Sequence, residues 1–81
     1  MSQARVRGAQ LRMARAALRM SVRELAAAAE VAPNTVVRIE ADQPANASSL
    51  GAIQRVLEAA GILFLPDDGD GPGVRLKPTS K

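Results

Sequence analysis

Apolar side chains recur every three or four residues over most of the first sixty positions, which is the spacing of amphipathic α-helices. The first such stretch carries one stripe, made of Val6, Gln10, Met13, Ala14, Ala17 and Leu18. Arginines occupy much of the remaining surface of this stretch. The pattern predicts a first helix from about Gln3 to Arg19.

A second, shorter helix is marked by its start. Ser21 is a good N-cap residue, and Glu24 follows three positions later, which completes a capping box. Apolar residues at helical spacing then continue the helix from Val22 to about Ala29. A helix of about two turns is not stable alone, so it must pack on its neighbours.

A third helix follows the short connection 30–32. Proline is favoured at the first position of a helix, so the helix is predicted from Pro33 to about Ala41. Val36 and Ile39 form its buried edge. The side chains left facing elsewhere are Asn34, Thr35, Val37 and Arg38.

The fourth helix is predicted from about Leu50 to Ala60, with Ser48 or Ser49 as its cap. Gly61 is then the expected left-handed residue after the helix end. The apolar run 62–65 predicts a strand, and the Gly-, Pro- and Asp-rich segment 66–73 predicts a turn.

A second strand over residues 74–76 would complete a hairpin. The predicted fold class is therefore all-α, with four helices and a short C-terminal β-hairpin. We divide the chain into a helical domain (1–61), the hairpin (62–77) and a frayed tail (78–81).

Charge is unevenly distributed along the chain. Residues 1–40 hold seven arginines and three glutamates, a net +4, whereas residues 41–81 hold four basic and five acidic residues, a net −1. Arginine is well suited to forked contacts with phosphate and guanine. The asymmetry points to a polyanionic partner, and charge alone supports a solvated basic face equally well.

Composition also argues against several kinds of site and several classes of protein. The chain contains neither cysteine nor histidine, which removes disulfides, thiolate metal sites and the commonest general base. Five arginines within residues 1–20, and no long apolar run there, are unlike a secretory signal. No stretch approaches a membrane span. We therefore expect a cytoplasmic protein that is not an enzyme and needs no cofactor.

Two short helices joined by a three- or four-residue turn form a helix-turn-helix arrangement, whose second helix enters the DNA major groove. The segments 18–26 (LRMSVRELA) and 31–40 (VAPNTVVRIE) resemble the Cro/C1-type repressor family, also called XRE-like regulators. The resemblance covers about residues 8–61. It implies a lambda-repressor-like DNA-binding domain that works as a homodimer on a palindromic operator.

The resemblance places the base-contacting positions at Pro33 and Asn34, with a further one at Arg38. Asn34 can hydrogen-bond an adenine edge, and Arg38 can fork onto guanine or reach a phosphate. Val37 can touch a thymine methyl group. Thr35 is equally suited to a phosphate contact and to a local bond within its own helix.

Two positions depart from the family pattern. The first residue of the second helix is Val22, where the family often has a DNA-contacting glutamine, so only apolar contact is available there. The usual serine cap of the third helix is replaced by Ala32. We include Ser21, Val22 and Arg23 among the predicted DNA-contacting residues, with Arg23 taking over a backbone contact and more weight falling on DNA shape.

Other residues have structural alternatives. Arg15 and Glu40 match a pair that forms an internal salt bridge in the family, so we interpret them as structural. Asn46 and Ser48 lie where the start of the fourth helix can approach a phosphate, although Ser48 is more simply explained as a cap.

Two glycine-containing patterns in the 67–73 segment are weak. Residues 67–71 (DDGDG) resemble part of a calcium loop but lack its final glutamate and flanking helices. Residues 69–73 (GDGPG) are not followed by a helix that could present amides to a nucleotide phosphate. A solvated hairpin turn explains both, and we expect no metal or small-molecule ligand.

The predicted hairpin is the remaining feature with functional promise. A lone hairpin is marginal in water, so it needs a partner surface. We hypothesise that Ile62, Phe64 and Val74 build a dimer interface. The alternative is that the hairpin folds onto its own fourth helix.

The sequence thus predicts a sequence-specific regulator, a repressor that binds double-stranded DNA as a homodimer. A protein-interaction or antitoxin-like module on the same scaffold is the alternative, because fold alone does not establish function.

Overall fold

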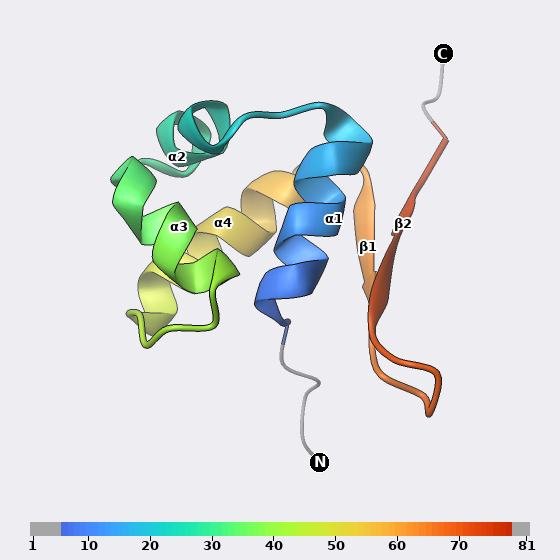
Figure 1. The fold of residues 1–81 in the computed structure, drawn as a ribbon. Helices are drawn as coiled ribbons and strands as arrows, with labels where there is room; N and C mark the ends of the chain where they lie inside the picture. The colour runs from blue at the N-terminus through green and yellow to red at the C-terminus, as the bar shows by residue number, and fades with distance from the viewer. Residues whose placement is uncertain (1–5, 79–81) are drawn as a thin grey trace.

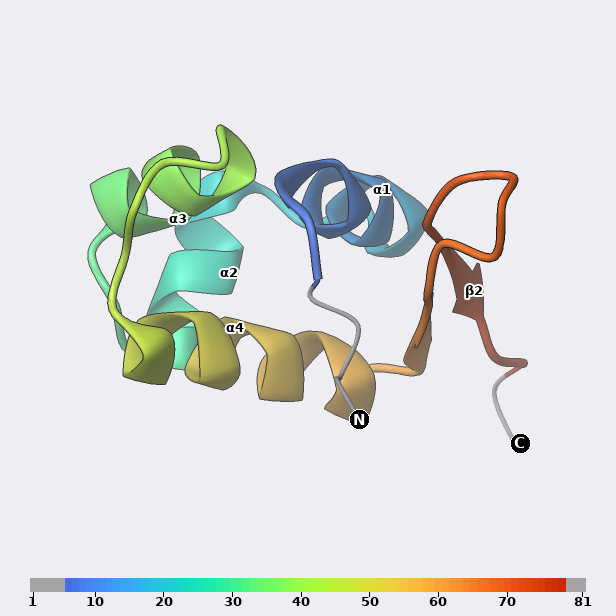
Figure 2. The same cartoon turned by 90° about the horizontal axis from the view of Figure 1, so that it is seen from below.

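The computed structural model describes residues 6–78 of the chain. Its elements are α1 (Gly8–Leu18), α2 (Val22–Ala29), α3 (Pro33–Glu40), α4 (Ala47–Ala59), β1 (Ile62–Leu65) and β2 (Gly73–Leu76). Figures 1 and 2 show α2, α3 and the first turns of α4 at one end of the molecule and the hairpin at the other. The predicted class, four helices with a short C-terminal hairpin, is confirmed. None of the helices formed by residues 6–78 is long and apolar enough to cross a membrane.

The first helix begins later than predicted. Residues 3–5 lie outside the described part of the chain, and Arg7 is the extended N-cap residue of α1. The helix starts there because the Gln10 side chain turns back and its Oε1 accepts the Arg7 backbone N–H at 2.8 Å. Arg19 then adopts a left-handed conformation, with φ of 54°, and ends the helix.

The second and third helices lie where the capping signals predict them. The Ser21 hydroxyl accepts the Glu24 N–H at 3.0 Å, and the Glu24 carboxylate accepts the Ser21 N–H at 2.8 Å, which is a complete capping box. Helix α3 begins at Pro33 and ends at Glu40, one residue before the predicted end.

The predicted start of the fourth helix is wrong by three residues. Asn46 is the N-cap residue and α4 begins at Ala47, so neither Ser48 nor Ser49 is the cap. Asn is as common at N-caps as Ser, and Ala is the best helix former, so the segment favours the earlier start. Ser48 lies in the first turn, where its hydroxyl donates to Asn46 Oδ1 at 3.1 Å.

The hairpin packs on its own helices. Its antiparallel register pairs Ile62 with Leu76 and Phe64 with Val74, which places these four residues on one face. Ile62 is buried at 2% exposure, and Phe64 and Val74 pack against the same core. The prediction that Ile62 forms a dimer interface is therefore wrong, because its side chain already fills the core of its own chain.

The core is aliphatic and spans the predicted boundary at residue 61. Its buried members are Leu11, Ala14, Leu25, Ala26, Ala29, Val36, Ile39, Ile53, Leu57 and Ile62. Because Ile62 belongs to this cluster, the hairpin and the helices share one core. Of the predicted frayed tail, residues 79–81 lie outside the described part of the chain.

A buried glutamine joins the hairpin to α1. Gln10 is 2% exposed, and its Nε2 donates to the carbonyls of Leu65 at 3.0 Å and Gly73 at 2.9 Å. These two residues face each other at the turn end of the hairpin. Gln10 thus caps α1 through its oxygen and holds both strands through its nitrogen, which satisfies a polar side chain inside the core.

The start of α1 lies directly against the end of α3. The Gly8 N–H donates to the Asp42 carboxylate at 2.9 Å, and Arg12 Nη1 donates to the Glu40 carbonyl. A Cβ atom on Gly8 would overlap the Glu40 carbonyl group. This contact therefore requires glycine at position 8 for space.

We predict that Gly8→Ala destabilises the protein by about 3 kcal/mol or more, because two backbones would have to separate. Gly51→Ala is the matched control within α4, where the nearest atom to a new Cβ is the flexible Arg55 Nη1 at 3.3 Å. That substitution should be neutral or stabilise the protein by up to about 1 kcal/mol. Urea denaturation of both variants measures the difference, and equal effects would contradict the packing argument.

We also predict that Gln10→Leu destabilises the protein by about 2–4 kcal/mol, since carbonyls of both strands lose their donor inside the core. Hydrogen exchange should show faster exchange in β1 and β2 than in α2. Uniform protection across the molecule in this variant would argue against a joining role for Gln10.

Candidate nucleic-acid interface

Helix α3 exposes one side of its surface and buries the other. Val36, Ile39 and Glu40 are buried, at 1%, 6% and 6% exposure. The exposed residues are Pro33, Asn34, Val37 and Arg38, and Val37 is 51% exposed. Ala32 precedes the helix without a side-chain cap, so Pro33 alone marks the start. Every predicted base-contacting position of this helix is thus open to solvent.

The predicted DNA-contacting residues at the start of α2 differ in how free their side chains are. Arg23 is exposed and free to reach a partner. The Ser21 hydroxyl is engaged as the cap of its own helix. Val22 is half-buried and packs against the core, which limits it to a small apolar contact.

A polar notch separates α3 from the first turn of α4. It has a volume of about 250 Å³ and is lined by Thr35, Arg38, Ala45, Asn46 and Ser49. Arg38 Nη2 donates to the Pro44 carbonyl at 2.8 Å, which holds the guanidinium beside the notch. Asn46 brings a side-chain amide to the N-terminus of α4, where backbone N–H groups favour negative charge.

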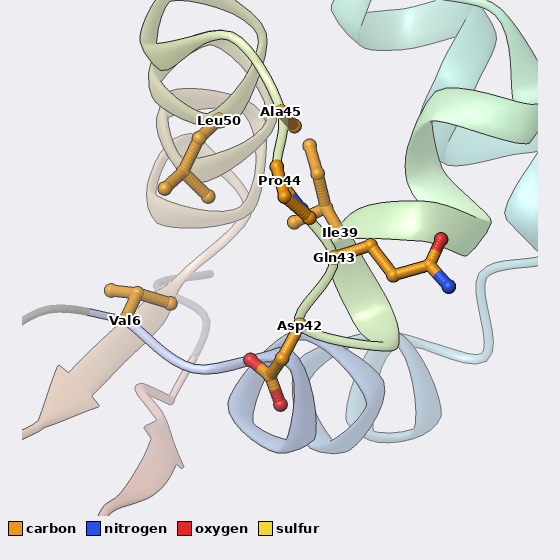
Figure 3. A pocket seen from close by; sticks show the side chains of 7 residues that line it. All are labelled: Val6, Ile39, Asp42, Gln43, Pro44, Ala45 and Leu50. Atoms are coloured by element: carbon orange, nitrogen blue, oxygen red, sulfur yellow. The ribbon is translucent and has the colours of Figure 1, made fainter.

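A second hollow lies beside the 42–46 loop (Figure 3). Its volume is about 270 Å³, and it is lined by Val6, Ile39, Asp42, Gln43, Pro44, Ala45 and Leu50. Most of these side chains are apolar, and the Asp42 carboxylate is already bound to the Gly8 N–H. The absence of a small-molecule ligand remains a prediction.

Behind the exposed side of α3, Arg15 and Glu40 form a two-pronged ion pair. Arg15 Nε lies 2.6 Å from Glu40 Oε2, and Arg15 Nη2 lies 2.9 Å from Oε1. Arg15 Nη1 also donates to the Met20 carbonyl at 3.2 Å. The side chains are 22% and 8% exposed, so the pair is shielded from water.

The hydrogen bond with Glu40 raises the pKa of Arg15, which outweighs the opposing effect of burial. A raised pKa means that the stabilisation is complete below the ordinary arginine pKa and is lost only at more alkaline pH. Arg15 therefore stays charged throughout the neutral range.

The arrangement of α2 and α3 agrees with the comparison to known families. A helix-turn-helix family model matches residues 11–62. The chain belongs to the Cro/C1-type helix-turn-helix family. This is a family of DNA-binding regulators, and the match spans α2, the turn and α3 together with most of α1 and all of α4. A search of curated proteins found no match to the chain.

The helix-turn-helix fold also brings together residues that the sequence did not single out. Ser49 lines the notch with Thr35 and Arg38, and Asp42 binds the start of α1. Gln10 was assigned to an apolar stripe because its spacing fits one, and no local pattern distinguishes a buried glutamine from an apolar residue at that position. The hydrogen bond from Arg38 to the Pro44 carbonyl in the 42–46 loop likewise cannot be predicted from helical spacing.

We predict that removing one partner of the Arg15–Glu40 pair destabilises the protein by about 3 kcal/mol, because the other charge is left shielded and unpaired. Arg15→Met and Glu40→Leu should each show this loss in denaturant melts. The double variant should recover most of it, since the volume is filled and no charge is stranded. Additive losses in the double variant would contradict the assigned pairing.

Proposed function

We propose that the protein is a sequence-specific transcriptional repressor that blocks an operator by binding it as a homodimer. The observation that supports this most directly is the exposed side of α3, which presents Asn34 and Val37 while Val36 and Ile39 anchor the helix in the core. An α-helix presented in this way fits the major groove. Family membership supports DNA binding, and the operator, repression and dimerisation are our proposal.

Base contacts come from the first half of α3 in this proposal. Asn34 donates to and accepts from an adenine edge, and Val37 packs on a thymine methyl group. Pro33 adds apolar contact beside Asn34, and its missing N–H costs nothing at the first position of the helix. The small number of polar groups here implies that DNA shape contributes to the choice of site.

Phosphate contacts come from the polar notch. Arg38 is tethered to the Pro44 carbonyl beside the notch, which favours the phosphate alternative over a guanine contact. Thr35 and Asn46 line the same notch, and the α4 N-terminus adds a favourable field for an anion. Arg23 adds a flanking contact from the start of α2.

A homodimer would place two copies of α3 about 34 Å apart, one turn of DNA. The hairpin lies at the end of the molecule away from α3, so a dimer formed there leaves both copies of α3 free (Figure 1). The alternative function, a protein-interaction module, is favoured only by the exposed Leu63 and Leu76 on that same hairpin.

The proposal predicts DNA binding that weakens steeply as salt rises, measured by fluorescence anisotropy on random duplexes and then on selected sites. Asn34→Ala should lower affinity for a selected site by about 1–3 kcal/mol and relax specificity. Arg38→Ala should weaken binding to all sequences alike and reduce the salt slope by about 1.

Arg55→Ala is the matched control, because Arg55 is also an exposed arginine but does not line the notch. Its binding should equal that of the wild type. If the wild type shows no binding to any duplex at low salt, the repressor proposal fails and the protein-interaction alternative takes its place.

A further inference from the structure

The outward face of the hairpin is apolar and open. The register pairs Leu63 with Arg75 and Leu65 with Gly73, on the face opposite Ile62 and Phe64. Leu63 is 39% exposed and lies outside the core cluster. Leu65 is half-buried and borders a small hollow that Val6, Gln10 and Phe64 also line. Leu63 and Leu65 therefore share a face that contributes no side chain to the core cluster of residues 6–78.

Charge is segregated along this hairpin. Its turn carries Asp67, Asp68 and Asp70, whereas Arg75 and Lys77 lie toward its open end. Backbone hydrogen bonds from Gly69 and Gly71, together with the charge of Arg7, lower the pKa of Asp67, so that carboxylate stays charged at neutral pH.

The two groups of charges do not neutralise each other within one hairpin. The salt bridge found within residues 6–78 is that of Arg15 with Glu40, so none of these aspartates forms an ion pair with Arg75 or Lys77 of its own hairpin. Lys77 lies four residues beyond Gly73, which is about 13 Å along an extended strand and more than the Debye length of about 8 Å at physiological ionic strength. Each hairpin thus presents an acidic tip (67–70) and a basic base (75–77) on either side of an apolar centre.

This pattern is self-complementary in only one orientation. Two hairpins that meet face to face across a two-fold axis align either tip to tip or antiparallel. Tip-to-tip alignment sets three aspartates against three aspartates, which is repulsive. Antiparallel alignment sets the acidic tip of each copy against Arg75 and Lys77 of the other and covers the leucines of both.

We propose that the outward face of the hairpin is the homodimer interface, with a second copy of the chain docked antiparallel so that Leu63 and Leu65 are covered and each acidic tip meets the other copy's basic base. This inference rests on the proposed function in that the pair works on DNA. Ile62, Phe64 and Val74 face the core of their own chain, so they are not the interface residues in this proposal. The residues of the opposite face of the hairpin, and the charges at its two ends, take that role.

The interface is small, because each strand has only four residues. Stable interfaces bury about 800 Å² per partner, so a hairpin face of this size forms a weak dimer that DNA binding reinforces. The opposite location of α3 and the hairpin lets both contacts form at once (Figure 2).

Charge reversal in the full-length chain tests the orientation, with sedimentation velocity without DNA as the measurement. An acidic variant (Arg75→Glu with Lys77→Glu) and a basic variant (Asp68→Lys with Asp70→Lys) should each dimerise at least about tenfold more weakly than the wild type. A chain that carries all four substitutions reverses both ends, and its dimerisation should return to the wild-type level.

Leu63→Gln tests the apolar contact of the proposed interface. This variant should dimerise more weakly than the wild type, while its melting temperature stays unchanged. All these positions are exposed, and Asp67, which accepts the Gly69 and Gly71 N–H groups, is left in place. Asp68→Lys also removes the hydrogen bond that Asp68 accepts from the Asp70 N–H, so the melting temperature of the basic variant is measured beside its dimerisation. A wild type that is monomeric up to about 1 mM, or a fourfold variant that fails to recover although it melts normally, overturns the inference.

The same samples separate this inference from the proposed function. A wild-type monomer that still binds DNA in a salt-dependent manner overturns the hairpin interface and leaves DNA binding intact. A charge-dependent dimer that binds no duplex supports the interface and overturns the repressor proposal.

Discussion

The close contact between the start of α1 and the end of α3 is the constraint on which the other features depend. Gly8 gives the space, its N–H binds Asp42, and Arg12 and Arg15 bind the carbonyl and carboxylate of Glu40. The last carbonyls of a helix carry partial negative charge, so two arginines suit this end of α3. An eight-residue helix has little stability of its own, and this anchoring supplies what its length cannot.

Anchoring α3 from behind leaves its other side available. Val36 and Ile39 pack the buried side of α3 into the core, and Glu40 fixes its C-terminal end. The exposed side chains of the helix are therefore not needed for core packing. The 42–46 loop extends this arrangement, since Arg38 binds the Pro44 carbonyl and ties α3 to the start of α4. A surface that such contacts already hold in place can bind DNA without a further loss of conformational entropy.

The hairpin forms the second end of the molecule. Gln10 connects it to α1 and Ile62 connects it to the helical core, whereas Leu76 at the open end of the same face stays 46% exposed. Its outer face, with leucines between opposite charges, is the one we propose for a second copy. The two ends are joined through α1 and α4 (Figure 1), so in the proposed dimer the way the hairpins meet would set the spacing of the two copies of α3.

The helices, their order and the helix-turn-helix motif could be predicted from the sequence, because capping residues and apolar spacing act within a few positions of each other. The Ser21–Glu24 box and Pro33 mark helix starts that the structure shares. The burial of Gln10 and the tether of Arg38 could not be predicted in this way. The inward direction of Ile62 was also decided only by the fold. Each of these depends on partners 6 to 63 residues away in the chain, and such partners are chosen by packing in three dimensions, which local patterns do not encode.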